Sequence, residues 1–83
     1  MAMRIHILFF ASYREILGRG DLTLELPEGS SVEDLLRRLW EQGEGYGALP
    51  ASPVVAVNRD FASLETLLAD GDEVAFVPPV SGG

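Results

Sequence analysis

Apolar residues occupy every second position in two stretches of the chain, residues 3–10 and 21–26. This alternation predicts β-strands that have one face against a hydrophobic core. Residues 54–58 and 73–77 are shorter runs that contain valine, and they predict two further strands. The side chains expected to face the core are Ile5, Ile7, Phe9, Leu22, Leu24, Leu26, Val74 and Phe76. The pattern therefore predicts a sheet of four or five strands.

The clearest helix in the sequence begins near residue 30. Ser30 and Glu33 fit a capping box, in which a serine hydroxyl and an acidic side chain bind free backbone N–H groups, and Ser31 and Asp34 fit it less well. The apolar residues that follow recur with helical spacing and predict a core-facing stripe of Val32, Leu35, Leu36, Leu39 and Trp40. We expect Trp40 to be buried and the helix to end at Gly43.

The remaining segments predict short elements. Residues 12–17 favour a short helix with Ser12 as its N-cap and Gly18 after its end, and residues 61–68 favour a short helix or 3₁₀ turn. Residues 43–53 are expected to form a loop. The strand after the long helix is expected to run parallel to one of its neighbours. Together the elements predict an α+β roll, with a mixed sheet over one main helix.

The composition narrows the possible functions. The chain has 13 acidic and six basic residues, a net charge of −7, which disfavours nucleic acid or an anionic membrane as a partner and suits a basic protein surface. It has no cysteine and one histidine, His6, so a thiolate zinc site, a nucleophilic thiol and most histidine metal clusters are excluded. We expect His6 to be solvated and the protein to be cytoplasmic, because no run approaches the ~20 apolar residues that span a bilayer.

The end of the sequence, PPVSGG, carries the strongest functional signal. Residues 1–77 are expected to form the domain and residues 78–83 a flexible tail. Two prolines stiffen the exit, and Gly82 and Gly83 leave a slim probe that fits a narrow cleft. The expected reactive group is the carboxylate of Gly83, which needs a nucleotide-binding partner because the sequence has no phosphate-binding loop. The alternative is an ordinary frayed terminus.

A second candidate is the face of the sheet that points away from the helix. Leu8 and Phe10 share this face of the first strand, Ala75 and Val77 share it on the last strand, and Phe61 is expected to join them. An apolar patch beside the base of the tail is typical of a protein interface. The alternative is that the first short helix covers it.

Three segments of the chain carry a resemblance to a known family: RIHILFFASYREILG at the start, VVAVN at the centre and DGDEVAFVPPVSGG at the end. Together they resemble the small subunit of molybdopterin synthase, a family of ubiquitin-like sulfur carriers with the β-grasp fold. The resemblance covers essentially the whole chain, and its C-terminal run is the most specific part. It implies a β-grasp roll and a carrier that is not itself an enzyme.

The resemblance also implies a cycle with several partners. An ATP-dependent activating enzyme adenylates the carboxylate of Gly83, and a sulfur donor converts it to a thiocarboxylate. The tail, with Pro79, Val80, Ser81 and Gly82, then enters the active site of the large subunit. Sulfur passes there to cyclic pyranopterin monophosphate and forms the dithiolene of molybdopterin. The catalytic side chains belong to the large subunit, and this chain itself binds no cofactor or metal.

The family's docking patch maps onto Phe10, Phe61 and Val77 of this sequence, and Val77 is smaller than the residues usual at its position. Leu8 and Arg14 adjoin this patch and are expected to contact the partner as well. The family's assembly implies a heterotetramer in which two carriers flank a dimer of the large subunit.

Three other functions remain open from the sequence. The chain can be a sulfur carrier for thiamine synthesis or tRNA thiolation, which uses the same chemistry for another client. It can be a ubiquitin-like modifier that is conjugated to lysines of other proteins. It can also be an interaction module whose tail has no chemical role.

Overall fold

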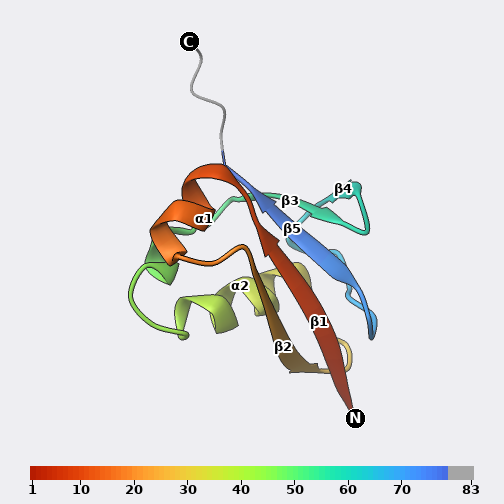
Figure 1. Ribbon diagram of the computed structural model, residues 1–83. Helices are drawn as coiled ribbons and strands as arrows, with labels where there is room; N and C mark the ends of the chain where they lie inside the picture. The colour runs from red at the N-terminus through yellow and green to blue at the C-terminus, as the bar shows by residue number, and fades with distance from the viewer. Residues whose placement is uncertain (79–83) are drawn as a thin grey trace.

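A single mixed sheet of five strands organises the computed structural model, which describes residues 1–78 (Figure 1). The elements are β1 (Ala2–Phe9), α1 (Ala11–Leu17), β2 (Asp21–Pro27), α2 (Val32–Trp40), a 3₁₀ helix η1 (Tyr46–Ala48), β3 (Val54–Val57), β4 (Asp60–Ala62) and β5 (Glu73–Val77). The strands lie in the order β2-β1-β5-β3-β4. Within the described residues, no helix is long and apolar enough to cross a membrane.

The pairing of the strands places β5 at the centre of the sheet. β1 is antiparallel to β2 and parallel to β5, and β3 is antiparallel to both β5 and β4. The prediction that the strand after the long helix runs parallel to a neighbour is therefore wrong. The reason is that β5, the last strand along the chain, lies between β1 and β3 and separates β3 from the first hairpin.

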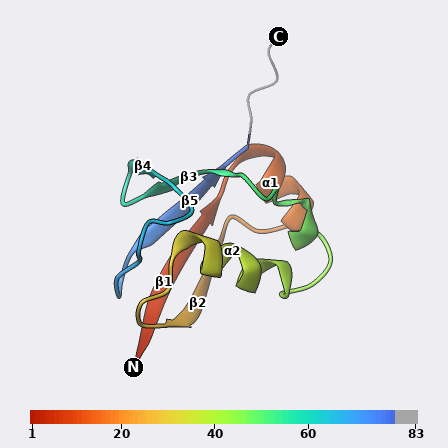
Figure 2. The same cartoon turned by 180° about the vertical axis from the view of Figure 1, so that it is seen from behind.

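Helix α2 covers one face of the sheet and forms the core with it (Figures 1 and 2). The predicted inward side chains of β1 and β5 are buried: Ile5, Ile7, Phe9, Val74 and Phe76 are each at most 1% exposed. Four residues of the α2 stripe are also buried, namely Val32, Leu35, Leu36 and Leu39. Tyr13 and Tyr46 complete the core, and the ring of Tyr46 meets the ring of Phe9 edge to face at 6.1 Å.

Trp40 differs from the prediction that it is buried, because 38% of it is exposed. It lies at the last position of α2, where its indole Nε1–H donates to the carbonyl oxygen of Leu49 at 2.8 Å. An indole N–H needs such a partner when it leaves water. Trp40 therefore ties the end of α2 to the following loop, which Leu49 anchors in the core.

The capping box of α2 uses the serine that the sequence ranked second. Ser31 is the N-cap: its Oγ accepts from the backbone N–H of Asp34, and the Asp34 carboxylate accepts from the backbone N–H of Ser31 at 2.9 Å. The hydrogen bonds from Ser31 hold the pKa of Asp34 below its ordinary value. Ser30 is buried instead, and its Oγ donates to the carbonyl oxygen of Pro27 at 2.7 Å. The helix ends at Trp40, before the expected Gly43.

Helix α1 begins one residue earlier than predicted. Its N-cap is Phe10, which makes no side-chain cap hydrogen bond, so the prediction of Ser12 as the cap is wrong. The helix ends as expected at Gly18, which takes the left-handed conformation with φ 72°.

The prediction of a short helix or 3₁₀ turn within residues 61–68 is confirmed only for a turn: the segment starts as strand β4 and continues as a turn over residues 63–66, without a helix. The residues after β4 instead provide hydrogen-bond acceptors for the first turn of α2. The carbonyl oxygens of Leu64 and Thr66 accept the backbone N–H groups of Glu33 and Val32 at 3.0 Å. These N–H groups lie in the first turn of α2, where no carbonyl group within the helix can accept them. A turn over residues 63–66, closed by the Thr66 N–H donating to the Ser63 carbonyl oxygen at 3.2 Å, thus satisfies donors at the start of α2.

Candidate functional site

The outer face of the sheet, away from α2, carries an apolar row that crosses four strands. Leu8 of β1 lies opposite Ala75 of β5, Ala75 lies opposite Ala56 of β3, and Ala56 lies opposite Phe61 of β4. Residues directly opposite each other in neighbouring strands point to the same face. The register therefore brings Leu8 and Phe61 to one surface, although they are far apart in the sequence.

A second set of apolar residues lies one step closer to the end of β5. Val77 lies opposite Val54 of β3, and Phe10 follows directly after β1. Phe61 is 84% exposed, Val54 47% and Phe10 46%. We give members of the two sets one name, the apolar outer surface, which consists of Leu8, Phe10, Val54, Phe61, Ala75 and Val77.

The described residues leave this surface open to a partner. Helix α1 was a candidate to cover it, yet α1 buries Tyr13 in the core while Phe10 and Phe61 stay exposed. Large side chains with such exposure on one face are typical of a protein interface. The docking roles of Leu8, Phe10, Phe61 and Val77 stay predictions, which the structure supports by placing them on one face.

Val54 is a member that the sequence prediction did not include. Val54 lies opposite Val77 at the start of β3, and it is exposed. The alternation of VVAVN does place Val54 and Ala56 on one face, so the signal was present. Only the position of β3 beside β5 shows that this face continues the apolar outer surface.

Arg14 lies apart from the cross-strand rows. It is an exposed residue of α1, and its Nε lies 3.4 Å from the position that a Cβ atom would take at Gly20. It lines a shallow hollow with Ala11, Glu15, Gly18, Arg19 and Gly20. Its backbone N–H donates to the carbonyl oxygen of Phe10 at 3.4 Å, so its predicted contact with a partner lies one helical turn from the apolar outer surface.

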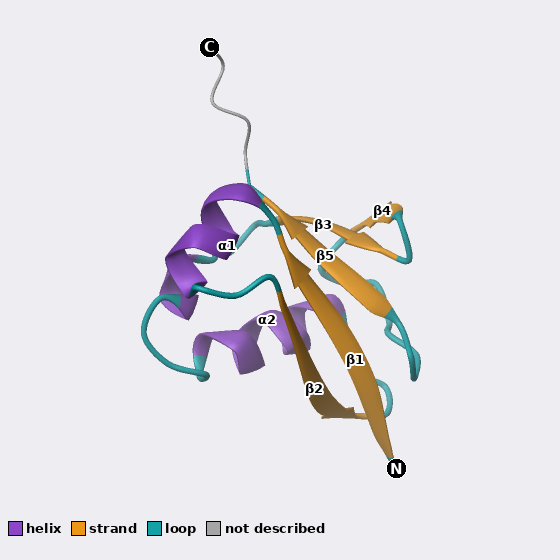
Figure 3. Ribbon diagram, viewed as in Figure 1, coloured by secondary structure: helices purple, strands orange, loops and turns teal. Residues whose placement is uncertain are grey.

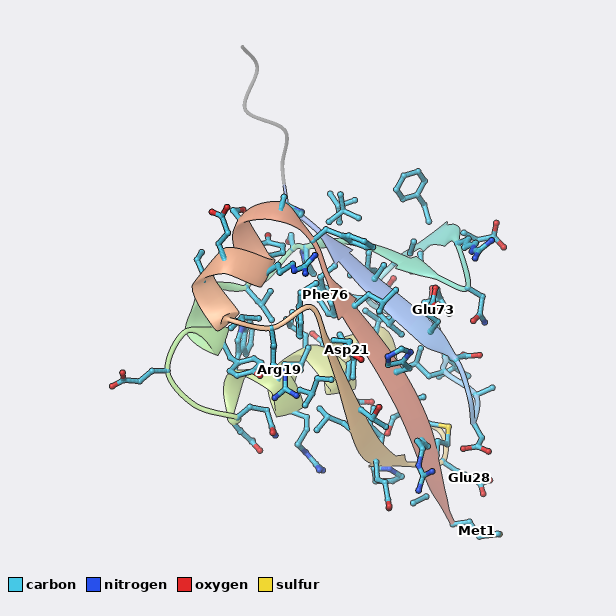
Figure 4. All side chains as sticks on the ribbon, in the orientation of Figure 1. Met1, Arg19, Asp21, Glu28, Glu73 and Phe76 are labelled. Carbon is cyan, nitrogen blue, oxygen red and sulfur yellow. The ribbon has the colours of Figure 1, made fainter. Side chains whose placement is uncertain are left out.

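The same face of the sheet becomes polar toward the N-terminal end of β1. His6 is 45% exposed in its side chain, and its Nε2 lies 3.1 Å from Oδ2 of Asp21. Asp21 of β2 and Glu73 of β5, both labelled in Figure 4, flank β1 on its two sides. This agrees with the prediction of a solvated histidine. The outer face is thus divided between a polar half and the apolar outer surface.

The apolar half adjoins the point where the chain leaves the sheet. β5 ends at Val77, beside the end of β1, and Pro78 is buried (Figure 3). The predicted tail residues Pro79, Val80, Ser81, Gly82 and Gly83 lie outside the described residues. The structure therefore fixes the base of the tail next to the apolar outer surface.

Two further observations concern the chemistry that residues 1–78 offer. These residues contain no group of three or more His, Asp or Glu side chains arranged to hold a metal ion. Burial raises the pKa of Tyr13 above the ordinary value of a phenol. What the arrangement can do is bind another protein beside the point where the chain leaves β5.

Comparison with known proteins gives a consistent result. A family model described as the ThiS family matches residues 7–83. The molybdopterin synthase sulfur carrier subunit of Chlamydomonas reinhardtii is 37% identical over 98% of this chain and 100% of the relative. That of Escherichia coli is 41% identical over 95% of this chain and 99% of the relative. Small archaeal modifier protein 3 of Haloferax volcanii is 33% identical over 98% of this chain and 100% of the relative.

Solved structures are similar over nearly the whole chain. A putative molybdopterin converting factor subunit 1 from Pyrococcus furiosus has a TM-score of 0.79 and 29% identity, and the match covers 94% of this chain and 99% of that one. A complex of subunits 1 and 2 of the molybdopterin-converting factor from Helicobacter pylori contains a chain with a TM-score of 0.71 and 26% identity, covering 98% of this chain and 100% of that one.

Proposed function

The chain belongs to the ThiS family and has the predicted ubiquitin-like β-grasp fold, and from this premise we propose that it is the sulfur-carrier subunit of a molybdopterin synthase. The observation that carries the proposal is the apolar outer surface beside the exit of the chain from β5. A carrier needs both features, because one binds the partner and the other delivers the reactive group.

In this proposal the chemical centre is Gly83, the last residue of the sequence. An activating enzyme transfers the adenylyl group of ATP to the Gly83 carboxylate and releases pyrophosphate. A sulfur donor then displaces AMP, which leaves a thiocarboxylate. Its sulfur bonds to a carbon of cyclic pyranopterin monophosphate in place of an oxygen substituent. Water then cleaves the acyl–sulfur bond, which leaves the sulfur on the pterin and regenerates the Gly83 carboxylate. ATP binds to the activating enzyme, and this chain holds no cofactor. The proposed location of this cycle is the cytoplasm.

The proposed receiving partner is the large subunit, which supplies the catalytic side chains. Phe10, Phe61 and Val77 dock on it, and residues 79–83 enter its active site. The Helicobacter pylori structure supports this step, because it is a protein–protein complex of subunits 1 and 2 of the molybdopterin-converting factor. The proposed assembly is a heterotetramer of two carriers and two large subunits.

Intact mass spectrometry tests the chemical centre. The full chain is incubated with ATP, the activating enzyme and a sulfur donor, and we expect a product about 16 Da heavier, because sulfur replaces one carboxylate oxygen. The matched control lacks Gly83 and keeps every residue of the sheet. An unchanged mass for the full chain, under conditions that charge a related carrier, would contradict the proposal.

A second candidate function is covalent modification of other proteins. The observation that favours it is the similarity to small archaeal modifier protein 3. The same carboxylate would then form an isopeptide bond with a lysine of a target protein. Peptide mass spectrometry of cell extracts distinguishes the two functions, since a Gly83 isopeptide on other proteins supports the modifier and its absence leaves the carrier.

A further inference from the structure

The backbone at the tip of the β3–β4 hairpin is held in an unusual conformation. The hairpin has a two-residue loop, Asn58–Arg59, because Val57 lies opposite Asp60. Both loop residues have positive φ, 51° for Asn58 and 74° for Arg59. Positive φ at both central positions is the pattern of a type I′ turn, for which Asn followed by Gly is the preferred sequence. Asn58 fits this preference, whereas Arg59 occupies the position that favours glycine.

The neighbouring structure imposes this conformation on Arg59. The backbone N–H of Asn58 donates to the carbonyl oxygen of Glu73 at 2.8 Å, and the Asn58 side chain donates to Oδ1 of Asp72 at 2.9 Å. The Asn58 side-chain oxygen also accepts from the backbone N–H of Glu73 at 3.0 Å. The loop is therefore fixed to the start of β5. A strained residue that persists in so fixed a loop is a candidate for a functional role.

The side chain of Arg59 is exposed. Its guanidinium makes no hydrogen bond or ion pair with residues 1–78. It lies two residues before Phe61, the most exposed member of the apolar outer surface. Exposed charges at the rim of an apolar patch set the orientation and the rate of docking.

We propose that Arg59 is a docking residue that pairs with a carboxylate on the large subunit, at the rim of the apolar outer surface. A guanidinium binds a carboxylate through two parallel hydrogen bonds, which fixes orientation as well as supplying attraction. The rest of the carrier is acidic, with a net charge of −7. Asp60 follows Arg59 in the chain, and Asp72 and Glu73 lie against the same loop, so Arg59 is a single positive charge among carboxylates. A partner carboxylate opposite it therefore helps select one register of docking. This inference rests on the proposed function, because it names the chemistry of the proposed partner.

Association kinetics with the purified large subunit test the inference. Arg59→Gln removes the charge and keeps the unfavourable turn residue, and Arg59→Lys keeps both the charge and the turn. At about 50 mM salt we expect Arg59→Gln to bind about fivefold more slowly and Arg59→Lys to stay within about twofold of the original chain. At about 1 M salt the difference should vanish, because exposed charges are then screened.

Two further variants separate charge from structure. Arg37→Ala removes an equal charge from α2, on the other side of the sheet, and should leave the rate nearly unchanged. Arg59→Gly removes the charge and relaxes the turn, so it should bind as slowly as Arg59→Gln while its Tm rises by about 3 °C. A rise in Tm with slower docking is a combination that a merely structural residue would not give.

The outcomes also separate this inference from the proposed function. Arg59→Gln binding at the original rate in low salt, or Arg37→Ala causing an equal loss, would overturn the role of Arg59 while leaving the carrier function in place. No binding of the original chain to the large subunit would overturn both.

Discussion

The two faces of the sheet differ in their exposure to solvent, although their side chains alternate along the same strands. On the inner face, Phe9 and Phe76 are at most 1% exposed and stack with ring centroids 6.1 Å apart. On the outer face, Phe61 is 84% exposed. The inner aromatic rings stabilise the fold, and the outer ring is available to a partner. The difference shows that stability and binding can be changed separately in this small protein.

The largest effect is expected from Phe76→Ala on the inner face. Removing a fully buried ring leaves a cavity, and the free energy of unfolding should fall by about 3–5 kcal/mol. That is a large part of the total for a domain of this size, which is about 4–12 kcal/mol. Urea unfolding measures it, with Phe76→Leu as the milder control. A loss below about 1 kcal/mol would contradict the separation of the faces.

Phe61→Ala on the outer face should have the opposite profile. Its free energy of unfolding should change by less than about 0.5 kcal/mol, because the ring is already in water. Its affinity for the large subunit should fall about 30-fold, the loss of about 2 kcal/mol that marks a central aromatic contact. Titration calorimetry measures this. Leu67→Ala is the matched control, since Leu67 is 70% exposed and lies outside the apolar outer surface. Equal affinities of the two variants would show that the apolar outer surface does not dock.

The smallest effect concerns the start of α2, which should influence the inner face alone. The pKa of Asp34 is lowered by the hydrogen bonds from Ser31, so its ionised form stabilises the folded state. That stability is fully present above the unfolded-state pKa of about 3.9 and is lost as pH falls through the lower folded pKa.

Asp34→Asn should therefore lower Tm at neutral pH, and its difference from the original chain should shrink below about pH 4. Thermal unfolding at a series of pH values measures this, with Glu33→Gln as the control in the same turn. Unchanged docking is expected throughout. A Tm difference that persists unchanged into strong acid would argue against the capping role.

The sequence predicted the alternating strands and the apolar stripe of α2 because these periodicities report local geometry directly. The prediction failed where the local structure depends on contacts with other segments of the chain. Leu64, Leu67 and Leu68 have helical spacing, yet their segment forms a turn and no helix, and its carbonyl groups bind the first turn of α2. Ser30 and Ser31 have the same chemistry, and only the burial of Ser30 leaves Ser31 to cap the helix.

The candidate site was likewise predicted from the sequence only in part. Alternation placed Leu8 and Val77 on the outer face, whereas the register of β3 against β5 added Val54. The conformation of Arg59 likewise depends on hydrogen bonds between Asn58 and the start of β5, two segments that are far apart in the sequence.

The central position of β5 has a mechanical consequence. The strand is bonded to β1 on one side and to β3 on the other, and the chain continues from its end toward the tail. Tension applied at that end acts along the strand axis, so it loads both rows of hydrogen bonds together in shear instead of peeling them open one by one. In the proposed carrier role, a partner that holds the chain beyond Val77 would therefore pull against both rows of hydrogen bonds at once.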